Sequence, residues 1–133
     1  MLEFENIDIN ISEKQKREIK NFPFLLLKND ILGKDFELSV TFVSPAKAKQ
    51  INIKYRQKDY IPNTLSFPYS DTSGEIFMQI ETIYSQAMDF ELSKKDFLLK
   101  IYIHSLLHLK GLDHGTKMEN AEAKYIKNYS NTY

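Results

Sequence analysis

The sequence predicts a mixed α/β (α+β) domain, with a mixed sheet of about four strands packed by helices. Two observations support this class. Apolar residues alternate with polar ones in some segments and recur at helical spacing in others, and the two kinds of segment interleave along the chain. The 133 residues are enough for one domain, and no repeat or linker divides them, so we expect one domain over residues 1–133.

Four segments have the pattern of strands. Residues 2–9 and 35–43 alternate apolar and polar positions, and residues 75–83 are rich in strand-forming side chains. Residues 64–68 (TLSFP) are short and end in proline, which suits an edge strand because proline lacks a backbone donor. A turn over residues 71–74 is expected to pair the last two segments.

Two helices are predicted in the first half of the chain by their capping residues. Ser12 and Gln15 form a capping box, and the helix that they begin should reach about residue 27, disturbed by Pro23. Ser44 and Pro45 suit the N-cap and first helical positions of a second helix, which continues to residue 56.

Two further helices are predicted in the C-terminal third. The first begins after Ser93, ends at Gly111 and is apolar on nearly all sides, so it should be the central, buried helix. The second covers about residues 116–129.

Composition excludes several classes of protein. The chain has no cysteine, which removes disulfide scaffolds and thiolate metal sites. The N-terminal residues show no secretory pattern, no apolar run is long enough to cross a bilayer, and we expect a cytoplasmic protein. The net charge of zero does not indicate general nucleic-acid binding, but it leaves room for a local basic patch.

All three histidines of the chain lie within eleven positions, at His104, His108 and His114. The first two are four residues apart on a predicted helix, so they share one face. Gly111 can turn the chain sharply at the helix end, and His114 can then return to the same point. Three imidazoles with no fourth protein ligand are typical of a zinc site that keeps an open position for water. The alternative is that these histidines are packed core residues.

The spacing H-x3-H-x2-G-x2-H is also that of metzincin metalloproteases, so we expect a zincin-like site on the central helix. Those enzymes carry a glutamate general base directly after the first histidine. Here that position is Ser105, which argues against peptide hydrolysis and for another metal-assisted hydrolysis.

A second informative stretch, residues 52–69, combines basic and aromatic side chains. Arg56 is one of only two arginines in the chain, and its planar guanidinium can bind a phosphate in a bidentate way. Lys54 and Lys58 flank it, and Tyr55 and other aromatic residues are interleaved. This combination suits single-stranded nucleic acid, although a solvated helix end is the commoner explanation of such charges.

Together these motifs resemble the YbeY family of bacterial endoribonucleases, also called rRNA maturation factors. The motifs are YR-x-K-D from Tyr55, LSFP from Leu65, a glycine–acid pair at Gly74 and Glu75, and H-x3-H-L-x-G-x-D-H from His104. The match runs from about residue 52 to the end of the histidine motif. The departures are Asn63 in place of a family aspartate, Glu75 in place of aspartate, and Ser105 in place of glycine.

The resemblance implies a zinc-dependent, single-strand-preferring endoribonuclease that acts in ribosomal RNA maturation and ribosome quality control. It implies one zinc ion per chain on His104, His108 and His114, a role for Arg56 in RNA binding or catalysis, and ribosomal RNA and the ribosome as partners. Asp113 is a candidate to orient a ligand histidine, and Glu75 is one of several candidate general bases. Two alternatives remain open: a small metallopeptidase, and a non-catalytic ribosome-assembly factor with a structural zinc.

Overall fold

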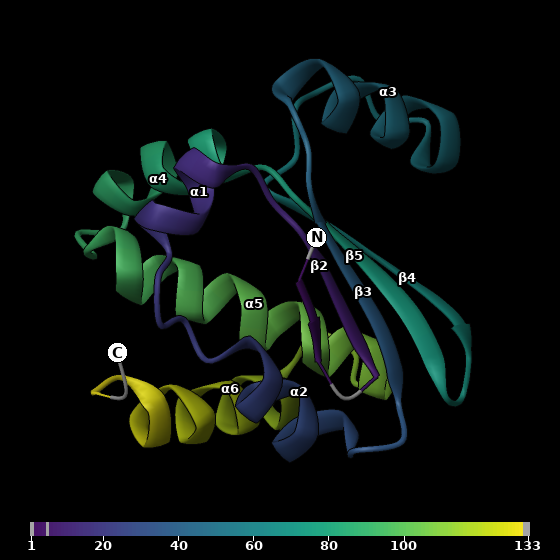
Figure 1. Ribbon diagram of the computed structural model, residues 1–133, viewed down its shortest axis with the longest axis vertical. Coiled ribbons are helices and arrows are strands. Elements are labelled where there is room, and N and C mark those ends of the chain that lie inside the picture. The colour runs from purple at the N-terminus through teal and green to yellow at the C-terminus, as the bar shows by residue number, and fades with distance from the viewer. Residues whose placement is uncertain (1, 5, 132–133) are drawn as a thin grey trace.

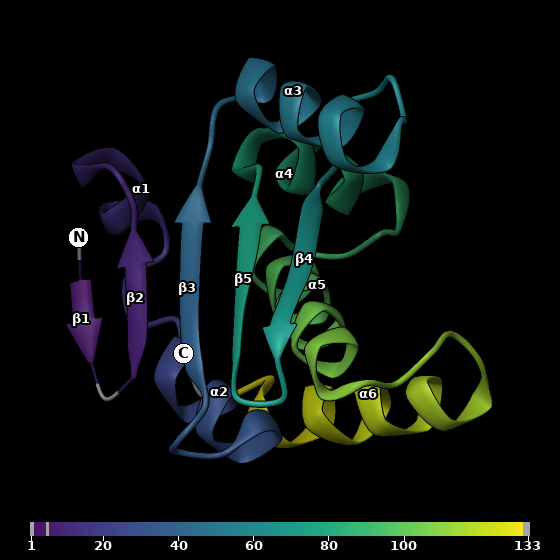
Figure 2. The same ribbon diagram turned by 90° about the vertical axis from the view of Figure 1, so that its right-hand side faces the viewer.

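The computed structural model describes residues 2–4 and 6–131, and the strands of these residues form one five-stranded sheet. The strands in chain order are β1 (Leu2–Phe4), β2 (Ile7–Asn10), β3 (Glu37–Phe42), β4 (Thr64–Ser70) and β5 (Ser73–Met78). Their spatial order is β1-β2-β3-β5-β4, as Figure 2 shows face-on. The strands β2, β3 and β5 run parallel, and β1 and β4 are antiparallel to their neighbours. The predicted mixed sheet and α/β class are confirmed.

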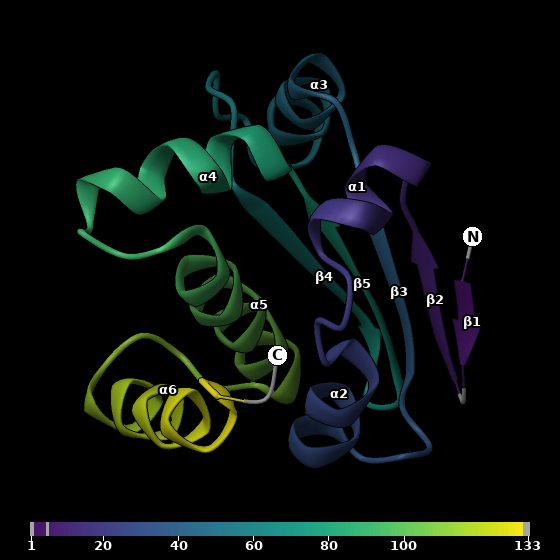
Figure 3. The ribbon, with the colours of Figure 1, turned by 60° about the vertical axis from the view of Figure 1, so that its left-hand side comes forward.

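Six helices surround this sheet unevenly. They are α1 (Glu13–Glu18), α2 (Phe24–Leu32), α3 (Pro45–Arg56), α4 (Ile80–Asp89), α5 (Lys94–Lys110) and α6 (Thr116–Tyr129). All except α3 lie on one face of the sheet, seen from the helical side in Figure 3. Only α3 lies toward the other side, at one end of the sheet, so most of that face is open (Figure 1). No helix among the described residues is long and apolar enough to cross a membrane.

The strand predicted over residues 2–9 is two strands. Asn6 has a positive φ of 55°, a conformation that asparagine tolerates better than most residues, and the chain reverses there. As a result β1 pairs antiparallel with β2, with Phe4 opposite Ile7. This hairpin accounts for a sheet of five strands where the alternation alone predicts about four.

The helix predicted from residue 12 to about residue 27 is interrupted. Ser12 and Gln15 form the predicted capping box, but α1 ends at Glu18. Asn21 has a φ of 70°, and Pro23 stands at the start of α2, where its missing backbone donor costs nothing. Pro23 therefore separates two helices rather than bending one.

The strand predicted over residues 75–83 is wrong beyond Met78. Gln79 ends β5 and caps a helix, since its side chain accepts a hydrogen bond from the backbone N–H of Thr82 at 2.8 Å. The next buried positions are Ile80, Ile83 and Ala87, which have helical rather than alternating spacing. The helix α4 was therefore missed because glutamine is an uncommon N-cap.

The prediction of a central, buried helix is correct for α5. Ser93 caps its start and Gly111, with a φ of 103°, ends it in the left-handed conformation. It packs against α2, α4, α6 and β4, and ten of its side chains are buried. One of them, Tyr102, is fully buried and donates a hydrogen bond to the carbonyl of Phe24 in α2 at 2.9 Å. The packing of α5 on several sides thus holds its polar residues in fixed positions.

Candidate metal site

The three histidines meet at the C-terminal end of α5. His104 and His108 lie one turn apart on α5, and His114 returns to them after the turn at Gly111. Their ring centroids are 4.6, 4.9 and 5.2 Å apart. One nitrogen from each ring lies within 4.8 Å of the others, and these three residues could hold a metal ion. We call His104, His108 and His114 the histidine cluster.

The separation of the ring nitrogens fits a small cation. The Nε2 atoms of His104 and His108 are 3.1 Å apart. Nitrogen ligands at about 2.0–2.1 Å from a tetrahedral zinc ion are about 3.3 Å from one another, so this pair is already close to the spacing that zinc needs. The cluster offers three nitrogens, and no fourth ligand joins it among the described residues, because the next carboxylate contacts the far side of a ring.

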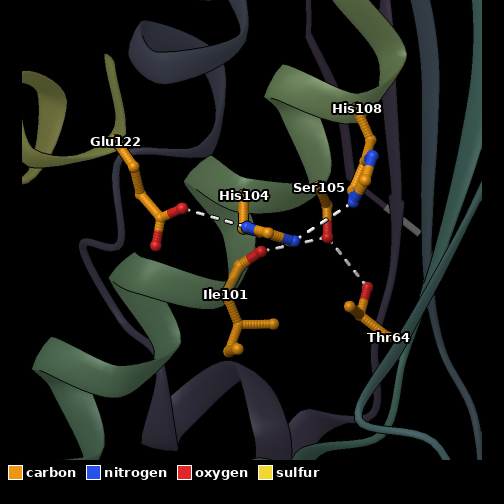
Figure 4. Close-up of polar contacts among 6 residues, drawn as sticks. All are labelled: Thr64, Ile101, His104, Ser105, His108 and Glu122. Atoms are coloured by element: carbon orange, nitrogen blue, oxygen red, sulfur yellow. Dashed lines mark hydrogen bonds and ion pairs between the residues drawn. The ribbon is translucent and has the colours of Figure 1, made fainter. Parts of the chain in front are cut away.

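That carboxylate is Glu122, which reaches the cluster from α6 (Figure 4). Its Oε2 lies 2.9 Å from Nδ1 of His104, and the side chain is only 12% exposed. A carboxylate at this distance keeps the proton on Nδ1, which leaves the lone pair on Nε2 facing the centre of the cluster. Glu122 therefore selects the tautomer of His104 that can bind a metal.

Asp113, the residue expected in this role, makes no hydrogen bond to a histidine within the described part of the chain. Its negative charge does act on His108, whose pKa it raises, but the net shift is downward. Burial lowers the pKa of His108 first, and the neighbouring rings of His104 and His114 lower it further. His108 is accordingly held in the neutral form that a metal ion requires.

Ser105, directly after the first histidine, makes its hydrogen bonds to residues outside the cluster. It is fully buried, its hydroxyl donates to the carbonyl of Ile101 at 3.0 Å, and it lies 3.0 Å from the hydroxyl of Thr64 (Figure 4). Ser105 thus joins α5 to the edge strand β4 and has no free position from which to act as a general base.

Gly74 lets the same helix approach the sheet closely. A Cβ atom at this position would lie 3.0 Å from Cδ2 of Leu109 and 3.2 Å from the backbone oxygen of Phe67. The glycine of the glycine–acid pair therefore sets how near the last turn of α5, with His108, lies to β5.

Arg56 lies at the C-terminal end of α3, on an element separate from the cluster. It is exposed, and its guanidinium donates to Oδ1 of Asn52 at 3.3 Å. Asn52 is fully buried and donates in turn to the carbonyl of Tyr60. These bonds hold the loop that leads from α3 to Thr64, but no described contact joins Arg56 directly to a histidine.

Asn63 and Glu75, which replace the two aspartates of the family motifs, also have defined places in the structure. Asn63 donates to the side chain of Gln86 at 2.8 Å, which is a structural contact with α4. Glu75 pairs with Phe67 across β4 and β5, and alternation along β5 points it to the face opposite α5. Glu75 does not join the histidine cluster, so the structure does not support it as the general base there.

Sequence reasoning found the three histidines but missed Glu122. Glu119 and Glu122 lie three residues apart on the predicted last helix, and nothing local says which of them faces the cluster. Only the packing of α6 against α5 decides it. The hydrogen bond from Tyr69 to Glu75 was missed for a similar reason, because it depends on the register of the β4–β5 pair.

Comparison with known proteins agrees with this geometry. The family model described as Endoribonuclease YbeY matches residues 1–130. A protein named Endoribonuclease YbeY from Thermodesulfovibrio yellowstonii is 33% identical over 126 residues, which cover 85% of this chain and 72% of that protein. Another of that name from Mesoplasma florum is 32% identical over 116 residues, which cover 79% of this chain and 66% of that protein.

A solved structure has the same fold. The solution structure of TM1509 from Thermotoga maritima superposes with a TM-score of 0.69 at 26% identity, covering 93% of this chain and 89% of that one. The N-terminal residues, which carry little motif, are included in the matched range of the family model. On these grounds the chain belongs to the endoribonuclease YbeY family.

Proposed function

We propose that this chain is a zinc-dependent endoribonuclease that prefers single-stranded RNA. Membership of the family supplies the class of reaction, hydrolysis of RNA. The finer assignments are part of the proposal: one zinc ion per chain, a single catalytic domain over residues 1–133, and action in the cytoplasm on ribosomal RNA in ribosome maturation and quality control.

The observation that carries the proposal is the histidine cluster with Glu122 behind it. Three ring nitrogens converge, and the fourth direction has no protein ligand among the described residues. Imidazole suits zinc, although other divalent ions accept the same ligands. When bound, such an ion polarises water or a phosphate oxygen, which is the chemistry that phosphodiester hydrolysis needs.

The protein groups have separate tasks in this proposal. His104, His108 and His114 hold the ion, and Glu122 orients the first of them. Arg56 binds a phosphate of the RNA and stabilises the negative charge that develops during cleavage. Its hydrogen bond to Asn52 holds the guanidinium at the start of the loop that leads from α3 to β4.

Two features favour this function over the alternatives. A metallopeptidase of the metzincin kind needs a carboxylate after the first histidine, and Ser105 is buried with its hydroxyl engaged. A structural zinc is expected where the core is too small to fold alone. Here a contiguous apolar core extends from β2 to α6, and the histidines lie at its margin.

The test is metal content and cleavage measured on the same preparations of wild type and His108→Ala. We expect about one zinc per wild-type chain and cleavage of a labelled single-stranded RNA. The variant should lose both while its circular dichroism stays unchanged. Equal cleavage by the two proteins would point to a contaminating nuclease and end the catalytic proposal. An unfolded variant would instead indicate a structural zinc.

A further inference from the structure

The open face of the sheet carries a pocket that the histidine cluster does not use. It lies between α3 and strands β4 and β5, has a volume of about 650 Å³, and includes Tyr55, Phe67, Tyr69, Glu75 and Phe77 in its lining. Figure 2 looks onto this face, with α3 above the upper ends of β4 and β5. We call it the open-face pocket.

One side of the pocket is a row of aromatic rings. Tyr55 from α3 packs edge-on against Phe67 with centroids 5.6 Å apart, and Phe67 packs similarly against Phe77 at 5.9 Å. Tyr55 is 58% exposed even though Phe67 supports it. An exposed ring held in place by another ring is a surface on which a flat heterocycle can stack.

The second feature of the pocket is the carboxylate of Glu75, of which one oxygen accepts a hydrogen bond. The hydroxyl of Tyr69 donates to Oε1 of Glu75 at 2.5 Å, and Glu75 raises the pKa of Tyr69 to about 12, so the phenol remains a donor. No donor among the described residues contacts the second oxygen, Oε2. Glu75 therefore offers one oriented acceptor beside the aromatic row.

Positive charge at the rim complements a polyanion rather than a free base. Lys47 and Lys54 line the pocket, and Nζ of Lys54 lies 5.2 Å from the ring centroid of Tyr55. A phosphate on either side of a stacked base would meet these cations.

We infer that the open-face pocket binds one unpaired nucleobase with an exocyclic amino group, such as cytosine, from single-stranded RNA. The base stacks on Tyr55, its amino group donates to Oε2 of Glu75, and the adjoining phosphates lie near Lys47 and Lys54. Uracil presents a carbonyl where cytosine has the amino group, so the carboxylate repels it. The inference rests on the proposed function, because it takes single-stranded RNA as the ligand.

The test compares short fluorescent oligocytidine and oligouridine by anisotropy, with the full chain in EDTA so that no cleavage occurs. Wild type should bind oligocytidine more tightly. In Glu75→Gln, the hydroxyl of Tyr69 still donates to the glutamine oxygen, so an amide N–H replaces Oε2. The preference should then reverse toward oligouridine, whereas the exposed-residue control Glu119→Gln should keep the wild-type ratio.

A second variant tests the stacking surface. Tyr55→Ala should weaken binding of both oligonucleotides by about 5- to 150-fold, the range for loss of one stacked base. Tyr125→Ala is the control, since it also follows a lysine that lies over its ring but stands on α6. Circular dichroism of each variant checks that the fold is kept.

The remaining outcomes overturn the inference. An unchanged cytidine-to-uridine ratio in Glu75→Gln would remove the base-reading role, and unchanged affinity in Tyr55→Ala would leave the open face to a protein partner. Neither result touches the proposed nuclease activity, which depends on metal content and cleavage in His108→Ala.

Discussion

The histidine cluster and the open-face pocket lie on opposite sides of one sheet and are built in opposite ways. The cluster uses eleven consecutive positions on one helix and its following turn, and Glu122 is the one distant residue in the described part of the chain that is hydrogen-bonded to it. The pocket draws on α3, β4 and β5, and it exists only through their packing and strand register. The local arrangement suits a fixed chemical centre, and the distributed one suits recognition of an extended ligand.

The largest expected effect is a loss of RNA cleavage without a loss of zinc from the histidine cluster, and a substitution of Arg56 tests it. Arg56→Lys keeps the charge but loses the bidentate fork, so we expect RNA cleavage to fall by about 10²- to 10³-fold, as for loss of one donor to a transition-state charge. Bound zinc should stay at the wild-type level. Single-turnover cleavage and metal analysis would check both.

The chain provides a matched control for that experiment, because its only other arginine, Arg17, is exposed on α1. Arg17→Lys should cleave like wild type. If both variants lose activity equally, the loss does not come from a contact that Arg56 alone makes, because both substitutions keep the charge.

The second effect acts from behind the cluster. Glu122→Gln removes the carboxylate that holds the proton on Nδ1 of His104, so zinc affinity should fall by about 10- to 100-fold. Glu119→Gln, three residues earlier and exposed, serves as the control. Competition with a zinc-binding dye would measure the affinity.

The same two variants test whether RNA binding at the open-face pocket is independent of the histidine cluster. Binding of single-stranded RNA in EDTA should be alike in Glu122→Gln and wild type, since the open-face pocket does not involve α6. A variant that lost RNA affinity without losing zinc affinity would show that Glu122 acts on the substrate instead.

The two regions also differ in how far the sequence predicts them. Ser93 and Gly111 give the bounds of α5, and the spacing of His104, His108 and His114 gives the cluster, because caps and i, i+4 contacts are local. Arg56 was found through its rarity beside sixteen lysines. The hydrogen bond from Arg56 to Asn52 could not be predicted, because nothing in the sequence indicates that Asn52 is buried.

The failures all depend on information that is not local. Asn6 and Asn21 adopt positive φ without being glycine, which divides a predicted strand and a predicted helix. Gln79 caps α4 where a shorter polar residue is usual. The face on which Glu75 lies follows from its pairing with Phe67, which no periodicity within β5 alone can assign.

The third effect is on the stability of the fold, and it concerns the close contact between β5 and the last turn of α5. Gly74→Ala would place a Cβ 3.0 Å from Leu109 and 3.2 Å from the backbone of Phe67, and the backbone cannot rotate away. We expect a loss of about 1–3 kcal/mol in the free energy of unfolding, measured by urea denaturation. Ser70→Ala, in the same hairpin, removes only an exposed hydroxyl that accepts from the backbone N–H of Thr72 at 3.1 Å, and it should cost less. An equal loss in both would place the strain in the turn.

The smallest effect is a pH dependence that belongs to the cluster alone. The pKa of His108 is lowered from 6.5 in the folded chain, so the unfolded chain takes up the proton first as the pH falls. The stability that neutral His108 contributes is present above pH 6.5 and is lost as the pH falls through the folded pKa.

The melting temperature of the metal-free protein should therefore drop between about pH 7.5 and about pH 5.5, and it should drop less in His108→Gln. Because no histidine lies in the open-face pocket, RNA binding by metal-free His108→Gln should follow the same pH profile as wild type. Equal drops in melting temperature in the two proteins would show that the pH dependence comes from another group and not from His108.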